Sequence, residues 1–502
     1  MQQGQLLLFI IALFPILSWM SLGVFKFFPK FYNFTFCLFP ILYFLNLFQG
    51  IKYFSNEIYS FTIIEAMRGL SMSVYVDKLS LIFLIALAII WIFFSFYAVK
   101  YFSILNNKNS YSINNFFVLI ISILNLLIIS KNLFTILFFY IILIICSYLL
   151  GIKYLNYHET KFSKFFNFAL YLESFFLFLA TVLSFKINGQ IEFVEKIIIP
   201  NNFDPFYHGI IFLLFFFGLF LSTVMPFYLF FNRFKFNSLI LISLFLISYG
   251  FSSGFIFIKI LNYIYGIKGF NLIVKNYGLI LLNSILTINL IITGIKLIKA
   301  TDMKSASLYL FLNQFLMLIF SLLIHASYKI NFTVISLLAF LLNFMVILFC
   351  TGNFELLIEK SSQKKLNGIF YLMPITTSIY LYGLLSLSGI SPSLSMVDKF
   401  FMISNLFKNK QFFSLMIFVI NNGFIIFYTY KTIKLIFLKD LATDENKKNS
   451  RVKIDMSLLN FAKKIDFDSQ LILTTLLLAI ISFSGLIFFS YVTQFVSFYE
   501  FF

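Results

Sequence analysis

The sequence predicts an all-α polytopic membrane protein with about fourteen transmembrane helices, arranged as two inverted five-helix repeats that each contain a broken helix. Three observations predict this class. Of the 502 residues, 61% are hydrophobic and only 11% are charged. Apolar runs long enough to cross a bilayer follow one another along most of the chain. Two of these runs are interrupted by proline and hydroxyl residues, at similar places in the two proposed repeats.

The apolar runs define the expected spans, because a helix of roughly 18 to 25 residues crosses the hydrocarbon core. They cover 5–24, 32–50, 77–101, 114–130, 132–152, 164–186, 208–231, 238–260, 275–297, 304–326, 331–354, 372–407, 411–438 and 470–491. Two stretches are too polar to cross, 50–76 and 439–468, and we expect the second to form an amphipathic or lateral element. The expected divisions are an N-terminal group of helices (1–113), a first repeat (114–260), a second repeat (261–438), and a polar connection with the final helix (439–502).

The net charge of +18 comes almost entirely from lysine. These lysines lie mainly in short loops, and their distribution favours a topology with both termini outside the cytoplasm. No basic stripe with interleaved aromatic residues occurs outside the loops. The charge therefore indicates membrane topology and not a nucleic-acid partner.

Soluble enzyme chemistry has no support in the sequence. It contains no phosphate-binding loop, no dinucleotide glycine pattern and no Ser-His-Asp spacing. Cys37, Cys146 and Cys350 lie inside apolar runs, so they indicate neither a disulfide framework nor a metal site. We expect no cofactor, no metal and no catalytic residue.

The run 372–407 contains a feature that an ordinary span avoids, the sequence Gly389-Ile390-Ser391-Pro392. Proline inside a helix frees a backbone carbonyl, and hydrocarbon offers no water to satisfy it. Such a break is tolerated where protein or a wet cavity surrounds it. Nearby serine hydroxyls can supply the missing hydrogen bonds, so we predict a broken helix at Gly389, Ser391 and Pro392.

Asp398 and Lys399 follow this break at mid-membrane depth. A charged side chain at that depth is costly and is a functional candidate for that reason. Successive residues on a helix point about 100° apart, so the two side chains need not pair with each other. The alternative is that Lys399 lies near a span end and extends to the interface.

A second interruption occurs in the run 208–231, where Ser222, Thr223 and Pro226 break the apolar sequence. The two breaks lie about five spans apart, and repeats with an odd number of spans must be inverted in the bilayer. This spacing is the basis for predicting two inverted repeats.

Few other ionisable residues lie within spans. Glu173 is a candidate proton relay or the structural partner of a neighbouring lysine, and Lys259 is a candidate carrier or a span-end anchor. Asp77 opens the run 77–101 with Ser80 three residues later, which is first a helix-capping signal.

Several stretches together resemble the antiporter-like membrane subunits shared by Mrp-type multisubunit cation/proton antiporters and respiratory complex I. Val76-Asp77-Lys78-Leu79-Ser80 resembles the entry to the third span of that family. The spacing of Asp302, Lys304 and Gln314 resembles the start of its tenth span, and Gly389-Ile390-Ser391-Pro392 followed by Lys399 resembles its broken twelfth helix. The fifth span and Pro226-Phe227-Tyr228-Leu229-Phe230 resemble the D-type antiporter subunits of Mrp complexes more than the subunits of complex I.

The resemblance implies fourteen spans, inverted repeats and a central row of charged groups along which protons or monovalent cations move. It also implies other membrane subunits as partners, with the lipid bilayer around them, and a bacterial cytoplasmic membrane, with an organellar inner membrane as the alternative. We carry the ion-pathway role over to Lys399, with Asp302, Lys304 and Gln314 as supporting positions and Lys259 as a less direct equivalent. The alternative function is proton pumping within an NADH-quinone oxidoreductase.

The departures from this family suggest another hypothesis. Ile141 stands where the family carries a glutamate, Leu221 or Ser222 where it carries a lysine, and Ser252 near a second lysine position. These neutral residues favour a non-conducting scaffold that keeps the fold and binds partners. A lipid-linked oligosaccharide flippase is a more remote hypothesis, which would require more charged residues around a central cavity.

Overall fold

The computed structural model describes residues 3–54, 59–67, 70–105, 110–154, 161–188, 192–193, 204–224, 239–275, 278–300, 303–326, 330–357, 368–437 and 465–487. Within these residues the chain is almost entirely helical, and ten helices are long and apolar enough to cross a membrane. The protein is thus a multi-pass helical membrane protein, as its composition predicts. The count of about fourteen spans stays a prediction.

The first part of the chain forms two helices, a β-hairpin and a third helix. These are α1 (Gln3–Phe25), α2 (Pro29–Phe54), β1 (Tyr59–Met67), β2 (Leu70–Val76) and α3 (Lys78–Leu105). The antiparallel hairpin pairs Tyr59 with Val76 and fills most of the stretch 50–76 that is predicted to lie outside the bilayer. The alternation of polar and apolar residues in β2 suits a strand, although a search for apolar runs does not identify it.

The next part contains the residues predicted as the first repeat, 114–260, and the beginning of the predicted second repeat, while the repeats themselves stay a prediction. Its elements are α4 (Ser110–Ile128), α5 (Leu133–Tyr154), α6 (Lys161–Asn188), α7 (Pro205–Phe220), the 3-10 turn η2 (Leu221–Thr223) and α8 (Leu239–Ile260). A π-helical turn, η4 (Leu261–Tyr265), and a short helix, α9 (Gly266–Lys275), come next. The apolar pattern does not predict α9 as a separate helix.

The remaining elements lie in the rest of the residues predicted as the second repeat, 261–438, and in the final span. They are α10 (Gly278–Lys299), α11 (Met303–Ala326), α12 (Ile330–Leu357), η6 (Ile369–Tyr371), α13 (Pro374–Ser388), α14 (Leu394–Lys408), α15 (Phe412–Phe437) and α17 (Ser469–Ile487). The predicted lateral element at 439–468 lies outside the described residues up to position 464.

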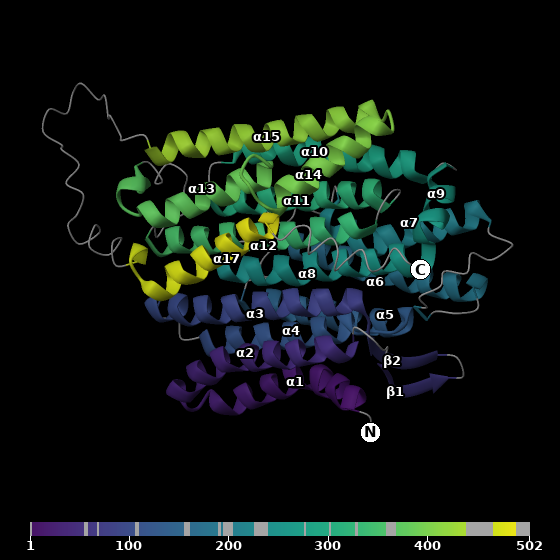
Figure 1. Cartoon of the computed structure of the whole chain (residues 1–502), viewed down its shortest axis with the longest axis horizontal. Coiled ribbons are helices and arrows are strands. Elements are labelled where there is room, and N and C mark those ends of the chain that lie inside the picture. Colours follow the sequence, from purple (N-terminus) through teal and green to yellow (C-terminus); the bar gives the residue numbers. More distant parts are fainter. Residues whose placement is uncertain are drawn as a thin grey trace, which may run out of the picture.

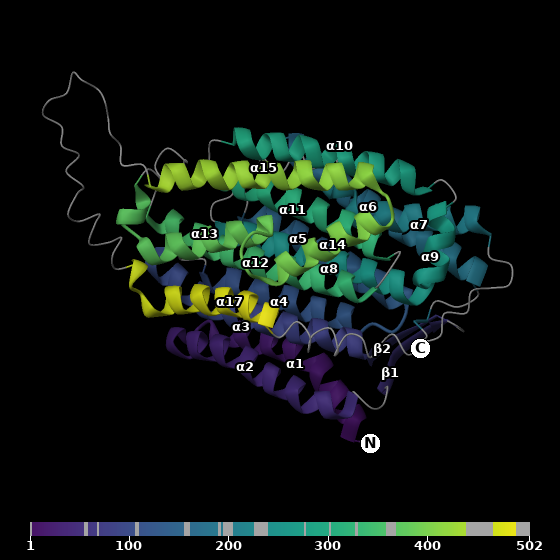
Figure 2. The same ribbon diagram turned by 45° about the horizontal axis from the view of Figure 1, so that its top comes forward.

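The helices lie side by side in one elongated bundle (Figure 1, Figure 2). In both views α1 and α2 form one edge, while α10 and α15 lie together at the opposite edge. The core lies between these edges. In the most apolar stretch of α11, 100% of the residues are buried, and in that of α12, 83% are buried, whereas the share for α1 is 33%. Both inner helices border the functional site described below.

A short stretch before α17 connects two distant helices. The buried carboxylate of Asp466 accepts hydrogen bonds from the backbone N–H groups of Ile375 (3.1 Å) and Thr376 (2.9 Å) and from the Thr376 hydroxyl. These groups belong to the first turn of α13, where N–H groups lack helical partners and the helix dipole favours an anion. Asp468 forms an ion pair with Lys100 of α3 at 2.8 Å. Residues 466–468 therefore fasten the start of α13 to α3.

Candidate functional site

The break between α13 and α14 is built by residues that stop one helix and start the next. Gly389 ends α13 with a φ of +79°, a left-handed conformation that glycine adopts without strain, and its N–H bonds back to Leu385 and Ser386. Ser393 then caps α14, because its side chain accepts from the N–H of Met396 at 3.4 Å. The helix is thus interrupted at residues 389–393. The carbonyls of Leu385 and Ser386 accept from the backbone of the break, and the carbonyl of Leu387 accepts from a side chain outside the helix.

Lys399 points its amine at this open helix end. Its Nζ donates to the carbonyl of Leu387 and to Oδ1 of Asn422 on α15, the latter at 2.8 Å. The side chain is only 8% exposed. The C-terminal end of a helix carries a partial negative charge, so the end of α13 stabilises the ammonium group in a place where water does not reach it freely.

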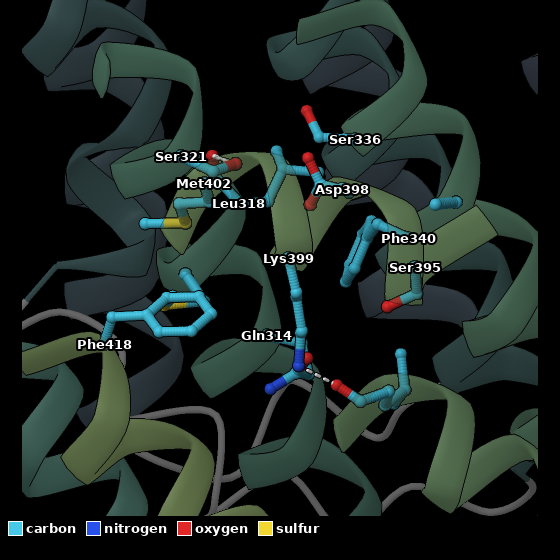
Figure 3. Close-up of a pocket in the computed structure, with 13 residues that line it drawn as sticks. Gln314, Leu318, Ser321, Ser336, Phe340, Ser395, Asp398, Lys399, Met402 and Phe418 are labelled. Carbon is cyan, nitrogen blue, oxygen red and sulfur yellow. Dashed lines mark hydrogen bonds between the residues drawn. The ribbon is translucent and has the colours of Figure 1, made fainter. Parts of the chain in front are cut away.

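A cavity of about 30 Å³ adjoins Lys399, which gives room for about two water molecules. It lies between α11, α12, α14 and α15, and its polar lining comprises Gln314, Ser321, Ser336, Ser395, Asp398 and Lys399. Figure 3 shows that Asp398 and Lys399 point in different directions, Asp398 toward Ser336 and Lys399 toward Gln314. The two charges thus face different parts of one polar space, as their adjacent positions on a helix predict.

A row of amide side chains leads away from the cavity. Gln314 donates to Asn313 (3.3 Å), and Asn313 donates to Asn421 of α15 (2.7 Å) and to Thr293 of α10 (3.2 Å). All four side chains are buried. The sequence pattern points to Gln314 but not to Asn313, Asn421 or Asn422. The Asn421-Asn422 doublet inside the apolar run 411–438 is the signal that could have revealed them.

Glu173 lies at the other predicted break, apart from Lys399. Helix α7 ends at Phe220, and after η2 the chain is extended at Val224. Oε1 of Glu173 accepts from the backbone N–H of Ser222 at 2.6 Å and bonds with the hydroxyl of Tyr249 on α8. Ser222 is thus at a helix end, as predicted, whereas Pro226 lies outside the described residues. Tyr249 has no sequence signal, since nothing in the pattern shows that α6 and α8 face each other here.

Lys259 is fully buried and has several partners. Its Nζ donates to the carbonyls of Ile128 (2.9 Å) and Ser130 (2.6 Å) at the end of α4. It also faces three aromatic rings with centroids 4.8, 5.2 and 5.3 Å away, those of Tyr75, Phe193 and Phe255. Lys431 of α15 makes the same kind of contact with the end of α10, through Ile298 (2.8 Å) and Ala300 (3.4 Å). Both lysines hold the C-terminal end of a neighbouring helix.

We expect Lys259→Met to lower the free energy of unfolding of the protein. The change leaves two buried carbonyls without their donor, at a cost of about 1 to 3 kcal/mol. Lys431→Met is the matched control, with a smaller effect because Lys431 is only half-buried. Thermal unfolding in detergent measures the effect of each variant. Unchanged stability of Lys259→Met would show that these contacts do not hold the end of α4.

Asp77 acts as a helix cap. Its Oδ1 accepts from the N–H of Ser80 (2.9 Å), and the Ser80 hydroxyl accepts from the N–H of Asp77 (2.8 Å). Tyr263 donates to the other carboxylate oxygen. The capping interpretation of the sequence therefore accounts for this aspartate. Asp302 lies outside the described residues, as does the side chain of Lys304.

Each of the three neutral positions noted in the sequence is close in the chain to a residue beside Glu173, namely Tyr140, Ser222 or Tyr249. Ile141 follows Tyr140, Leu221 precedes Ser222 in η2, and Ser252 donates to the carbonyl of Tyr249 at 3.1 Å. None of the three carries a charge.

No model of a known protein family and no curated protein matches the sequence. Solved structures do match its fold. A chain in the structure of the Mrp complex from Dietzia sp. DQ12-45-1b superposes with a TM-score of 0.77 at 13% identity, covering 99% of this chain and 97% of that chain. A chain of the membrane-bound sulfane sulfur reductase, an archaeal respiratory membrane complex, superposes with a TM-score of 0.72 at 13% identity, covering 97% and 98%. Over almost its whole length, the chain therefore has the fold of a chain found in each of these two membrane complexes.

Proposed function

We propose that the chain is a membrane component of a multisubunit monovalent cation/proton antiporter of the bacterial cytoplasmic membrane, and that ions move through it past Lys399. The observation that carries the proposal is the buried amine of Lys399, held at an open helix end beside a polar cavity. An ionisable group at that depth is expensive to keep, and ion traffic is the usual reason for keeping it. The likeness to a chain of an Mrp complex supports the assignment, and the sequence resemblance favours the D-type antiporter subunits.

The geometry suggests how Lys399 can load and release a proton. In the ammonium form, Nζ donates to the Leu387 carbonyl and is attracted by the end of α13. When the proton leaves, that attraction is lost and the neutral amine binds the carbonyl more weakly. Water in the adjoining cavity can take the proton toward Asp398, which lines the same space. Loss of the proton thus weakens the contact between Lys399 and the end of α13.

Two alternatives follow from specific observations. The fold is also that of a chain in a respiratory membrane complex, which is compatible with proton pumping within an NADH-quinone oxidoreductase. The neutral Ile141, Leu221 and Ser252 favour a scaffold that binds partner subunits without conducting. In each alternative the partners are other membrane subunits.

Purification of the native assembly through a tag on this chain tests the proposal. We expect other small membrane subunits to co-purify, and we expect vesicles containing the assembly to move protons when a monovalent cation is added. Assemblies lacking this chain serve as the control. Co-purification of quinone-reducing subunits would select the oxidoreductase alternative, and normal exchange by assemblies without the chain would overturn its conducting role.

A further inference from the structure

Four buried side chains from four elements meet where α7 ends. They are Tyr140 of α5, Glu173 of α6, Ser222 of η2 and Tyr249 of α8, and each is buried, with Tyr140, Glu173 and Ser222 at 0% exposure and Tyr249 at 4%. Glu173 bonds with the backbone of Ser222 and with Tyr249, as described above. The hydroxyls of Ser222 and Tyr140 lie next to this pair. We call these four residues the Glu173 cluster.

The oxygen of Tyr249 has more acceptors than it has protons. It contacts the Leu219 carbonyl at 2.9 Å and Oε1 of Glu173. A tyrosine hydroxyl has a single proton and can donate to only one of them. A carbonyl is always an acceptor, so when Tyr249 donates to Leu219, the bond with Glu173 needs a proton from the carboxyl group. Both contacts are ordinary two-centre hydrogen bonds only if Glu173 is a carboxylic acid.

The charge around Glu173 leads to the same protonation state. Among the residues that the structure describes, no lysine, arginine or histidine forms an ion pair with this carboxyl group. An ionised carboxylate buried without a cation costs several kcal/mol, and the donors on Oε1 offset only part of that. The neutral acid avoids most of the cost.

Three further oxygens of the cluster are buried and make no hydrogen bond of ordinary geometry in the described part of the chain, although the Ser222 hydroxyl lies beside Glu173 and the Tyr140 hydroxyl beside Tyr249. They are Oε2 of Glu173, Oγ of Ser222 and the hydroxyl of Tyr140. Buried polar atoms without partners are uncommon and call for an explanation. Because these oxygens are grouped around one carboxyl group, they can accept a hydrogen bond from an added proton, and the hydroxyls can reorient when the proton leaves.

We propose that the Glu173 cluster is a proton-binding site, separate from Lys399, in which Glu173 holds the proton and Tyr249 orients it. The ligand is a proton and not a metal cation, because the cluster contains a single carboxyl group and the described residues include no group of three or more His, Cys, Asp or Glu side chains that could hold a metal ion. The proposal rests on the proposed function for the use of this proton, but its binding is a separate property of the chain.

Infrared difference spectroscopy of the full-length protein tests the binding directly. We expect a C=O stretching band of a protonated carboxylic acid that shifts in D₂O and is lost in Glu173→Gln. In Tyr249→Phe the band should persist at a shifted frequency, because the acid loses one hydrogen-bond partner. Glu355→Gln is the matched control, since Glu355 also bonds with a tyrosine, Tyr101 at 2.8 Å, but is only half-buried. That variant should leave the Glu173 band unchanged.

A carbodiimide provides a second readout, because it reacts with protonated carboxyl groups in apolar surroundings and leaves a stable acylurea that mass spectrometry locates. We expect the adduct on Glu173, with equal yield in sodium chloride and choline chloride. Protection by sodium would overturn the proposal in favour of a cation site. Absence of both the band and the adduct in a protein with native thermal stability would show that Glu173 is ionised. Neither result depends on whether Lys399 supports exchange.

Discussion

Replacement of Lys399 by alanine is expected to abolish cation/proton exchange by the reconstituted assembly, down to the level of vesicles without protein. Among the described residues that line the cavity, Lys399 is the one whose side chain donates to the Leu387 carbonyl at the end of α13, and the change removes it. Lys399→Arg should also be inactive while keeping the fold, since a guanidinium keeps the positive charge but does not release its proton. The measurement is the decay of an imposed pH gradient on addition of a monovalent cation.

Lys408→Ala is the control for this prediction, because Lys408 is on the same helix and exposed. It should leave the flux unchanged. If Lys399→Ala exchanged ions at the normal rate, the ion-pathway role would be wrong and the scaffold hypothesis would gain. If Lys399→Arg were fully active, Lys399 would serve as a fixed charge and not as a proton carrier.

Gly389→Ala is expected to impair both folding and exchange. At φ +79° an L-residue is strained by about 1 to 2 kcal/mol. The new Cβ would also lie 2.7 Å from Cδ of Lys399, so the lysine would have to leave its place. Thermal unfolding measures the first effect, and the pH-gradient assay measures the second.

Gly423→Ala provides the matched control on α15. A Cβ there would meet nothing within 4 Å, and alanine is favoured over glycine inside a helix by roughly 0.5 to 1 kcal/mol. This variant should be as stable as the parent or more so, with normal exchange. Equal behaviour of the two variants would show that the break at Gly389 does not depend on its left-handed glycine.

The sequence predicts well what depends on local chemistry. The apolar runs form helices. Gly389 and Pro392 mark the break because each restricts or frees the backbone conformation at its own position. The partners of the buried charges are not predictable in the same way. Asn422 and Tyr249 come from helices whose packing against α14 and α6 is a tertiary property, and no local pattern encodes it. The β1–β2 hairpin is not predicted for a simpler reason. Its alternating polar and apolar residues look the same as a polar loop between two spans.

The fastening of α13 to α3 by Asp466 and Asp468 makes the two halves of the broken helix mechanically unequal. Its first half is clamped at its far end, whereas the half that carries Lys399 begins after the joint at residues 389–393. A change of charge at Lys399 is then expected to displace α14 more than α13, whose first turn is held by Asp466. The moving element would then be α14. The held end of the broken helix would be the first turn of α13, one helix length away from the break and next to the start of α17.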